Sequence, residues 1–290
     1  YPLLLNDLTN IHIFDQGWLK ANNAEKPTDV TNKVEGYATF NANGTGPFIV
    51  ESRVPDSKTV LVVNPNWWDE KKHNIDRIEF TPIASAATRV AALLSGEIDF
   101  TENAPVQDLP RLQATPGVKV MEGNELRTIM FGFNMRDTLA NGKPNAFADV
   151  KMREAVAQAI DLNLIRDKVM RGKSRVTGTY VAPAIPGYSE AQDVPVPYDP
   201  DAAAATIKEL GAEGFEFELV CANDVWVNEE EICNAIVSML TRVGLKPVLS
   251  IGPNAVQQIK QSGGEADMFS FGWANEPMLD SYSILLQVFA

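Results

Sequence analysis

The spacing of apolar and polar residues predicts a chain in which strands and helices alternate. Short runs rich in β-branched and aromatic residues, typical of strands, occupy 46–54, 58–64, 75–80, 98–100, 118–121, 127–134, 215–220, 246–251 and 267–271. Apolar residues at helical spacing occupy 85–95, 106–113, 150–160, 162–171, 201–210, 227–243 and 255–261. Strands that alternate with helices indicate an α/β fold class.

Residues with special backbone preferences support several of these elements. Pro55–Ser57 carries turn residues between two strands and predicts a β-hairpin. Gly96 is placed to end the helix at 85–95 in the left-handed conformation, and Asp149 is placed to cap the helix at 150–160. The stretch 176–200 is rich in Pro and Gly and has no clear period. A loop of that length is typically functional or strongly anchored.

Length and charge restrict the class of protein. The chain has 290 residues, a formal net charge of -13 and 25 Lys and Arg residues that form no basic run. We therefore do not expect a nucleic acid or an anionic membrane surface as partner. The length fits about two domains, and no apolar run approaches the roughly 18 residues that would span a bilayer.

The two ends of the sequence and its cysteines lead to two expectations. The chain begins at Tyr1 and ends inside the apolar helical pattern Ile284–Ala290, so we expect a fragment of a longer protein. Cys221 and Cys233 are too few for a disulfide framework. We expect two buried thiols, with a single disulfide as the alternative.

Motifs for nucleotide binding and catalysis do not match well. Asn43–Pro47 (N-G-T-G-P) lacks the Lys of a phosphate loop and leads into a strand, so Gly44 and Gly46 are predicted to form a turn in which a positive φ or a close backbone approach excludes a Cβ. The acidic run Glu229–Glu231 is interpreted as the solvated start of a helix, where acids favour the dipole. His12 and His73 have no metal-ligand spacing, so no metal site and no cofactor are expected.

A series of loose motifs follows one another in a fixed order along the chain: G-T-G-P-F at 44–48, N-P-N-W-W-D at 64–69, 89–99, 147–161, 198–211 and G-W at 272–273. Their order and spacing resemble the family 5 extracellular solute-binding proteins, which are the dipeptide-, oligopeptide- and nickel-binding receptors of ABC importers. The resemblance covers about residues 35–290. It implies a periplasmic-binding-protein-like fold of type II, with two lobes around a cleft. Residues 1–125 would be the C-terminal portion of lobe I, and residues 126–290 would be lobe II with a truncated C-terminus.

The resemblance also implies a ligand site. In the family, a Trp that follows Gly is followed three residues later by an acid that pairs with the ligand's ammonium group. Here these positions hold Trp273 and Glu276, where Glu replaces the usual Asp. Asn275 lies between them, and Asp280 is the alternative anchor. Further candidates follow strands, at the carboxyl ends where open α/β sheets bind ligands: Asn134, Asn223 and Asp224.

The function implied is that of the substrate-binding component of an ABC importer. It would capture a peptide or peptide-like solute in the periplasm by lobe closure and deliver it to the membrane permease, as a monomer without catalysis. One alternative is a receptor of the same fold for an opine, sugar, nickel chelate or glutathione. Another is a sensory or chaperone-like binding protein. An enzyme would need a nucleophile within hydrogen-bond reach of a base.

Overall fold

The computed structural model describes residues 3–29, 34–276 and 278–288. The chain divides into two compact units, Tyr1–Ala84 and Ser85–Ala290. The expected lobe boundary between residues 125 and 126 lies inside the second unit and stays a prediction.

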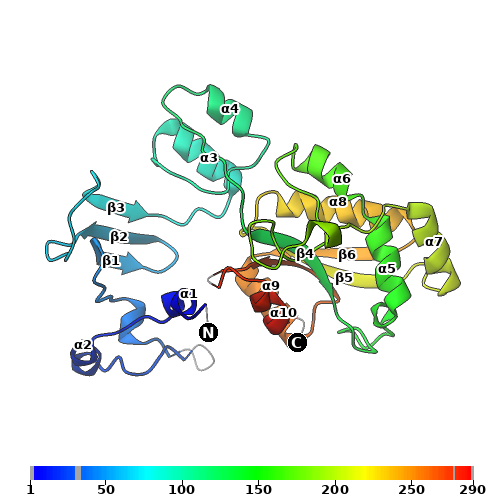
Figure 1. Ribbon diagram of the computed structural model, residues 1–290, viewed down its shortest axis with the longest axis horizontal. Coiled ribbons are helices and arrows are strands. Elements are labelled where there is room, and N and C mark those ends of the chain that lie inside the picture. Colours follow the sequence, from blue (N-terminus) through cyan, green and yellow to red (C-terminus); the bar gives the residue numbers. More distant parts are fainter. Residues whose placement is uncertain (1–2, 30–33, 277, 289–290) are drawn as a thin grey trace. The chain divides into compact units, whose positions relative to one another are not determined.

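The first unit contains a small antiparallel sheet with the order β1-β2-β3 (Figure 1). Val54 pairs with Lys58 across the turn at 55–57, so the predicted hairpin is confirmed. The elements of this unit are α1 (Leu4–Asp7), η1 (Leu8–Asn10), α2 (Gln16–Ala21), η2 (Tyr37–Thr39), β1 (Phe48–Val54), β2 (Lys58–Val63) and β3 (Arg77–Phe80).

The glycine turn before β1 is held differently from the prediction. Gly44 and Gly46 have no positive φ, and a Cβ added at either would meet no atom within 4 Å. The expected steric need for glycine is therefore wrong. Asn64 fixes this corner instead, because its side-chain Nδ2 donates to the Gly46 carbonyl at 2.9 Å and its backbone N–H donates to the Pro47 carbonyl at 2.8 Å.

The second unit contains most of the predicted helices and strands. Asp149 caps α5 through its side chain and Gly96 ends α3 at φ 76°, as predicted. Ser85, predicted as the first residue of this helix, is its N-cap. The predicted strands at 98–100 and 118–121 are not formed, since these segments pair with no strand among the described residues. The elements are α3 (Ala86–Ser95), α4 (Leu109–Ala114), β4 (Arg127–Phe133), η3 (Ala146–Ala148), α5 (Val150–Ala159), α6 (Leu162–Leu164), η4 (Ile165–Val169), η5 (Glu190–Gln192), α7 (Pro200–Glu209), β5 (Glu216–Ala222), α8 (Glu229–Arg242), β6 (Lys246–Gly252), α9 (Asn254–Gly263), β7 (Met268–Ala274) and α10 (Tyr282–Val288).

The sheet of the second unit has the strand order β4-β7-β5-β6. Strands β5, β6 and β7 are parallel, and β4 runs antiparallel to β7. Ala222 pairs with Gly252, and Arg127 pairs with Ala274. The carboxyl ends of the three parallel strands therefore share one edge of the sheet with the amino end of β4.

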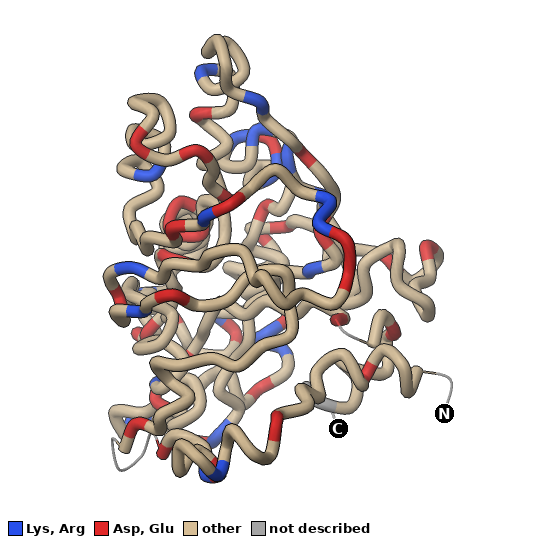
Figure 2. The backbone as a smooth tube through the Cα atoms, turned by 90° about the vertical axis from the view of Figure 1, so that its left-hand side faces the viewer, with Lys and Arg blue, Asp and Glu red and all other residues tan. Residues whose placement is uncertain are grey.

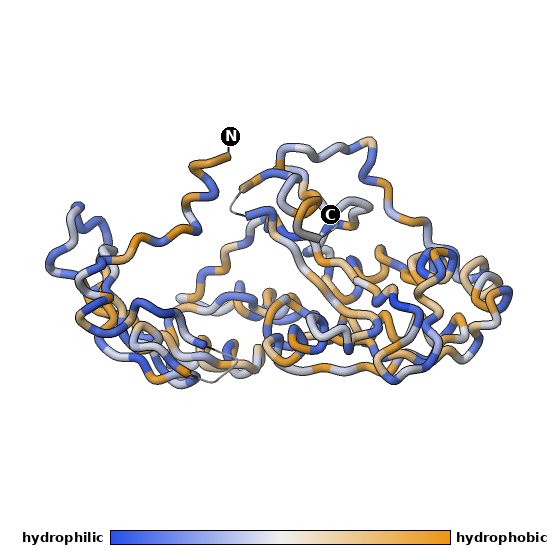
Figure 3. Tube along the Cα trace, turned by 90° about the horizontal axis from the view of Figure 1, so that it is seen from below, coloured by the Kyte–Doolittle hydropathy of each residue, from blue (hydrophilic) through white to orange (hydrophobic). Residues whose placement is uncertain are grey.

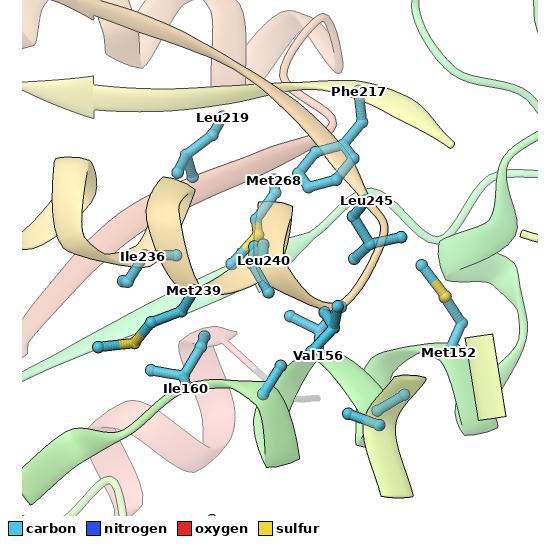
Figure 4. Packing of buried hydrophobic residues seen from close by; sticks show 14 of the residues in the cluster. Met152, Val156, Ile160, Phe217, Leu219, Ile236, Met239, Leu240, Leu245 and Met268 are labelled. Carbon is cyan, nitrogen blue, oxygen red and sulfur yellow. The ribbon is translucent and has the colours of Figure 1, made fainter. Parts of the chain in front are cut away.

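The core follows from the alternation of side chains along these strands. Phe217 and Leu219 of β5 point to one face, where they pack with residues of α5 and α8 such as Val156 and Leu240 (Figure 4). Apolar stretches recur along the strands and helices of this unit (Figure 3). Ile284 of α10 packs with a smaller cluster that includes Ile185 and Trp273. The sheet thus has helices on both faces, as the α/β pattern predicts.

The charged positions agree with the sequence analysis. Acidic and basic residues are interspersed along the backbone, without a long basic stretch in the described part of the chain (Figure 2). Within the same described residues, every helix is too short or too polar to cross a lipid bilayer.

The cysteines form a disulfide. Cys221 and Cys233 are both fully buried, and their sulfur atoms are bonded at 2.09 Å. The expectation of two buried thiols is therefore wrong, and the alternative of a single disulfide is confirmed. The bond joins the end of β5 to the second turn of α8.

The long loop at 176–200 is strongly anchored around one carboxylate. The side chain of Asp193 is only 2% exposed and accepts hydrogen bonds from the Thr177 hydroxyl at 2.7 Å and the Gly178 N–H at 2.6 Å. The Tyr188 hydroxyl donates to it at 2.9 Å, and Arg175 forms an ion pair with it. This network replaces regular secondary structure as the source of order in the loop.

Candidate functional site

Most of the predicted site residues lie at the carboxyl edge of the parallel strands. Trp273 is the last residue but one of β7, and Asn275 and Glu276 follow that strand directly. Asn223 and Asp224 follow β5, where the Asn223 N–H donates to the Gly252 carbonyl at 3.2 Å and so ties the ends of β5 and β6 together. This edge is where open α/β sheets bind ligands.

Asn134 does not join this group. It follows β4, whose end pairs with the start of β7 through Phe133 and Met268. Because β4 is antiparallel to β7, its carboxyl end lies at the opposite edge of the sheet. The Asn134 side chain accepts from the Arg136 N–H at 3.1 Å and donates to the Gly264 carbonyl at 3.4 Å.

Trp273 is half-buried and belongs partly to the core. Its ring stacks with that of Phe271 at a centroid distance of 6.0 Å, and its side chain packs with the cluster around Ile284. The indole N–H donates to the Ser283 hydroxyl at 3.4 Å. The remaining exposed part of the ring offers an apolar surface next to the carboxyl edge.

The three candidate acids at this edge differ in the hydrogen bonds that their carboxylate oxygens already accept. One oxygen of Asp280 accepts from the Tyr282 N–H at 2.8 Å, at the start of α10. One oxygen of Asp224 accepts from the Asn254 N–H at 2.9 Å, at the start of α9. Glu276 is exposed and has no hydrogen bond or ion pair with the residues that the structure describes.

Asn275 adds an unsatisfied polar group to the same edge. Its side chain is fully buried, and its Oδ1 accepts from the Ser283 hydroxyl at 3.2 Å. Its Nδ2 has no hydrogen-bond partner within the described part of the chain. Such a donor is costly to leave without a partner, and a bound water or ligand oxygen would satisfy it.

Two residues at this edge were missed or misjudged from sequence. Glu229 is 3% exposed, so its assignment to a solvated face is wrong. Its Oε1 accepts from the Ala222 N–H at 2.9 Å and the Ser270 hydroxyl at 2.5 Å. Trp226 packs against Gly272, where an added Cβ would come within 2.5 Å of the indole ring. The position of Glu229 was available from sequence, because it shares a helical face with Cys233, Ile236 and Leu240.

The buried carboxyl of Glu229 predicts a pH-dependent stability. Burial raises its pKa above the ordinary range, and the hydrogen bonds from Ser270 and Ala222 offset only part of this effect. The folded state therefore favours the protonated acid. Protonation of Glu229 stabilises the fold at low pH, and this contribution is lost as the pH rises through the raised pKa. We expect the free energy of unfolding of Glu229→Gln, relative to that of the wild type, to increase by about 1 kcal/mol from pH 4 to pH 8.

Denaturant unfolding at several pH values measures this difference. Glu230→Gln is the matched control, because Glu230 lies one residue further on α8 and is exposed. Its stability relative to the wild type should not change with pH. A constant difference between Glu229→Gln and the wild type from pH 4 to pH 8 would contradict the prediction.

Comparison with known proteins gives one consistent family. The description "Bacterial extracellular solute-binding proteins, family 5 Middle" matches residues 4–289. Among curated relatives, heme-binding protein A of Haemophilus influenzae is 27% identical over 246 residues, which is 80% of this chain and 42% of that protein. Di/tripeptide-binding protein 3 of Pseudomonas aeruginosa is also 27% identical, over 80% of this chain and 43% of that protein. The chain thus spans less than half the length of these relatives.

Solved structures show the same fold. The chain aligns with NikA from Staphylococcus aureus in complex with Ni(L-His)2 at a TM-score of 0.80 and 18% identity, over 100% of this chain and 57% of that protein. DppA from Helicobacter pylori, solved with the peptide STSA, aligns at a TM-score of 0.75 and 21% identity, over 90% of this chain and 48% of that protein. These matches confirm the predicted periplasmic-binding-protein-like α/β fold.

Proposed function

We propose that this chain, which belongs to the bacterial extracellular solute-binding proteins of family 5, is part of the substrate-binding component of an ABC importer and captures a peptide or peptide-like solute. The ligand would be held by closure of two lobes and then delivered to the membrane permease. We place the protein outside the cytoplasmic membrane. The buried disulfide supports that location, since disulfides persist in oxidising compartments such as the periplasm.

One observation carries the peptide proposal: Glu276 is an exposed acid without a partner among the described residues, three positions after Trp273. A carboxylate beside an aromatic ring suits the free ammonium group of a peptide, which gains both an ion pair and contact with the ring. Asp280 and Asp224 are less suited, because each already accepts a backbone hydrogen bond at the start of a helix.

Native mass spectrometry of the purified protein tests the ligand class directly. A bound ligand would be detected as added mass and identified after denaturation. Peptides would support the proposal. A sugar, an opine or a metal chelate would keep the receptor function and contradict the peptide assignment. A protein that stays empty across peptide and sugar panels would favour a sensory or chaperone-like role.

Single substitutions test the ammonium anchor. We expect Glu276→Gln to weaken binding of a peptide with a free amino terminus by at least about tenfold, or 1.4 kcal/mol, because it removes the charge that pairs with the ligand. Asp280→Asn is the matched control, since an amide oxygen can still accept from Tyr282. Its effect should be no more than about twofold. Isothermal titration calorimetry provides both affinities.

An N-acetylated peptide separates this mechanism from a general loss of binding. It should bind the wild type about as weakly as the free peptide binds Glu276→Gln. If acetylation leaves the affinity of the wild type unchanged, Glu276 is not the anchor, whatever the ligand class. That result would leave open a peptide held by its backbone or carboxylate.

A further inference from the structure

A cavity of about 380 Å³ lies at the edge of the sheet opposite the candidate site. It is formed where the end of β4 meets the end of α9 and the start of β7. Its volume is within the range of pockets that hold small molecules. Among the residues that line it are Phe133, Asn134, Met135, Arg136, Gln261 and Phe269.

The guanidinium of Arg136 is held against the backbone at this cavity. Gly264 has φ 70°, and an added Cβ there would lie 2.3 Å from Arg136 Nη1. The guanidinium therefore packs directly on the glycine. Asn134 links the same two segments, because its side chain accepts from the Arg136 N–H at 3.1 Å and donates to the Gly264 carbonyl at 3.4 Å. This arrangement places the cation beside the cavity.

Arg136 forms no ion pair with the residues that the structure describes. Two of the neighbouring charges, Asp267 and Lys260, already have partners. Asp267 is buried and accepts from the N–H groups of Glu218 at 2.8 Å and Ala140 at 3.4 Å. Lys260 pairs with Glu218 at 2.6 Å, and the Glu265 side chain lies against Gly263. An unpaired guanidinium beside a cavity attracts an anion.

Apolar side chains form part of the cavity wall, beside the polar side chains of Asn134 and Gln261. Phe269 lies over Gly132, where an added Cβ would come within 2.6 Å of its ring, and Phe133 lies on the neighbouring strand. Met135 is 65% exposed, so a flexible apolar side chain stands at the rim. Gln261 donates to the Ser270 carbonyl at 3.4 Å and closes the side toward α9. A ligand here would meet aromatic and thioether surfaces next to one positive charge.

We propose that this cavity binds a small monocarboxylate with an apolar body. The planar fork of an arginine matches a carboxylate with two parallel hydrogen bonds. One guanidinium balances one negative charge, which favours a monocarboxylate over a phosphate dianion. The apolar part of the ligand would pack between Phe269 and Met135. The site lies at the opposite edge from Trp273 and Glu276, so the inference does not depend on the proposed function.

The test compares three carboxylates (benzoate, phenylacetate and hexanoate) with their neutral amides. Two-dimensional NMR of the labelled protein follows the Arg136 Nε–H and Gly264 N–H signals during titration. We expect at least one carboxylate to shift both signals with saturation, and its amide to bind at least tenfold more weakly. Arg136→Gln should weaken the same carboxylate at least tenfold. Met135→Ala should weaken it several-fold, and more for an aromatic ligand than for hexanoate.

Arg111→Gln is the matched control, because Arg111 is an exposed arginine of α4 without an ion pair in the described part of the chain. It should leave the affinity unchanged. Circular dichroism should show the same fold for all variants, since the replaced side chains are exposed. The proposal is overturned if none of the three carboxylates shifts these signals. It is also overturned if an amide binds as well as its carboxylate, or if Arg136→Gln binds like the wild type.

Discussion

Replacing Asp193 by Ala should lower the free energy of unfolding by about 2 kcal/mol, since it removes the buried acceptor that several donors of the loop share. The side chain of Asp193 is 2% exposed and accepts from Thr177, Gly178 and Tyr188 in addition to its ion pair with Arg175. The two parts of the loop are in close contact here, because a Cβ added at Gly178 would lie 2.2 Å from the Val194 backbone. Chemical denaturation measures the loss.

The effect of Asp193 should also depend on pH. Burial alone would raise its pKa, but the hydrogen bonds from Thr177, Gly178, Tyr188 and Arg175 outweigh burial and lower the pKa well below its usual range. A lowered pKa gives stability that is present above the pKa of the unfolded chain and lost as the pH falls below it. The difference between the wild type and Asp193→Ala should therefore be constant from pH 5 to pH 7 and shrink as the pH falls below about 4.

Glu190→Ala controls for a general sensitivity of this loop. Glu190 lies three residues before Asp193, and its side chain is exposed. Its replacement should change the free energy of unfolding by no more than about 0.5 kcal/mol. Equal losses for the two variants would contradict an anchor centred on Asp193. Asp193→Asn should fall between the wild type and Asp193→Ala, because it keeps an acceptor for Gly178 but loses the charge.

Local sequence patterns correctly predicted the elements whose formation depends only on residues within or next to them. Helix α3 ends at its left-handed Gly96 and α5 begins after its N-cap Asp149, as the sequence predicted. The segments at 98–100 and 118–121 have strand-like composition but no strand partner among the described residues. A strand needs a neighbour to pair with, and the pattern of one segment contains no information about that neighbour.

The candidate site was predicted only in part, because some of its residues are close in sequence and others are brought together only by strand pairing. Trp273 lies near the end of β7, and Asn275 and Glu276 follow that strand directly, so their proximity is a local property. The position of Asn134 depended on the direction in which β4 pairs, and alternation along a strand does not specify whether it runs parallel or antiparallel. Glu229 shows the opposite case. Its burial could have been inferred from helical spacing, but its charge led to an assignment to solvent.

The disulfide is the feature with which sequence reasoning had most difficulty, and it lies next to the candidate site. Two cysteines that are 12 residues apart can pair only if the fold brings them together, and their Cα atoms lie 6.7 Å apart here. The intervening segment carries Asn223, Asp224 and Glu229. The disulfide therefore encloses the loop that leads from the carboxyl end of β5 into α8. Glu229 also links the two ends of this loop, because its side chain accepts a hydrogen bond from the Ala222 N–H.

Removing this disulfide with the Cys221→Ala and Cys233→Ala double variant should lower the free energy of unfolding by about 3 kcal/mol, the value expected for closing a loop of roughly this length in the unfolded chain. Reduction of the wild type under unfolding conditions, followed by refolding in reductant, should give a similar loss. Thiol titration in denaturant provides the control, because the unreduced wild type should show no free thiol and the reduced protein should show two. Two free thiols before reduction, or equal stability with and without reductant, would contradict the disulfide. A loss of stability with unchanged ligand affinity would mean that the hydrogen bonds of Glu229 are sufficient to shape the loop in the folded protein.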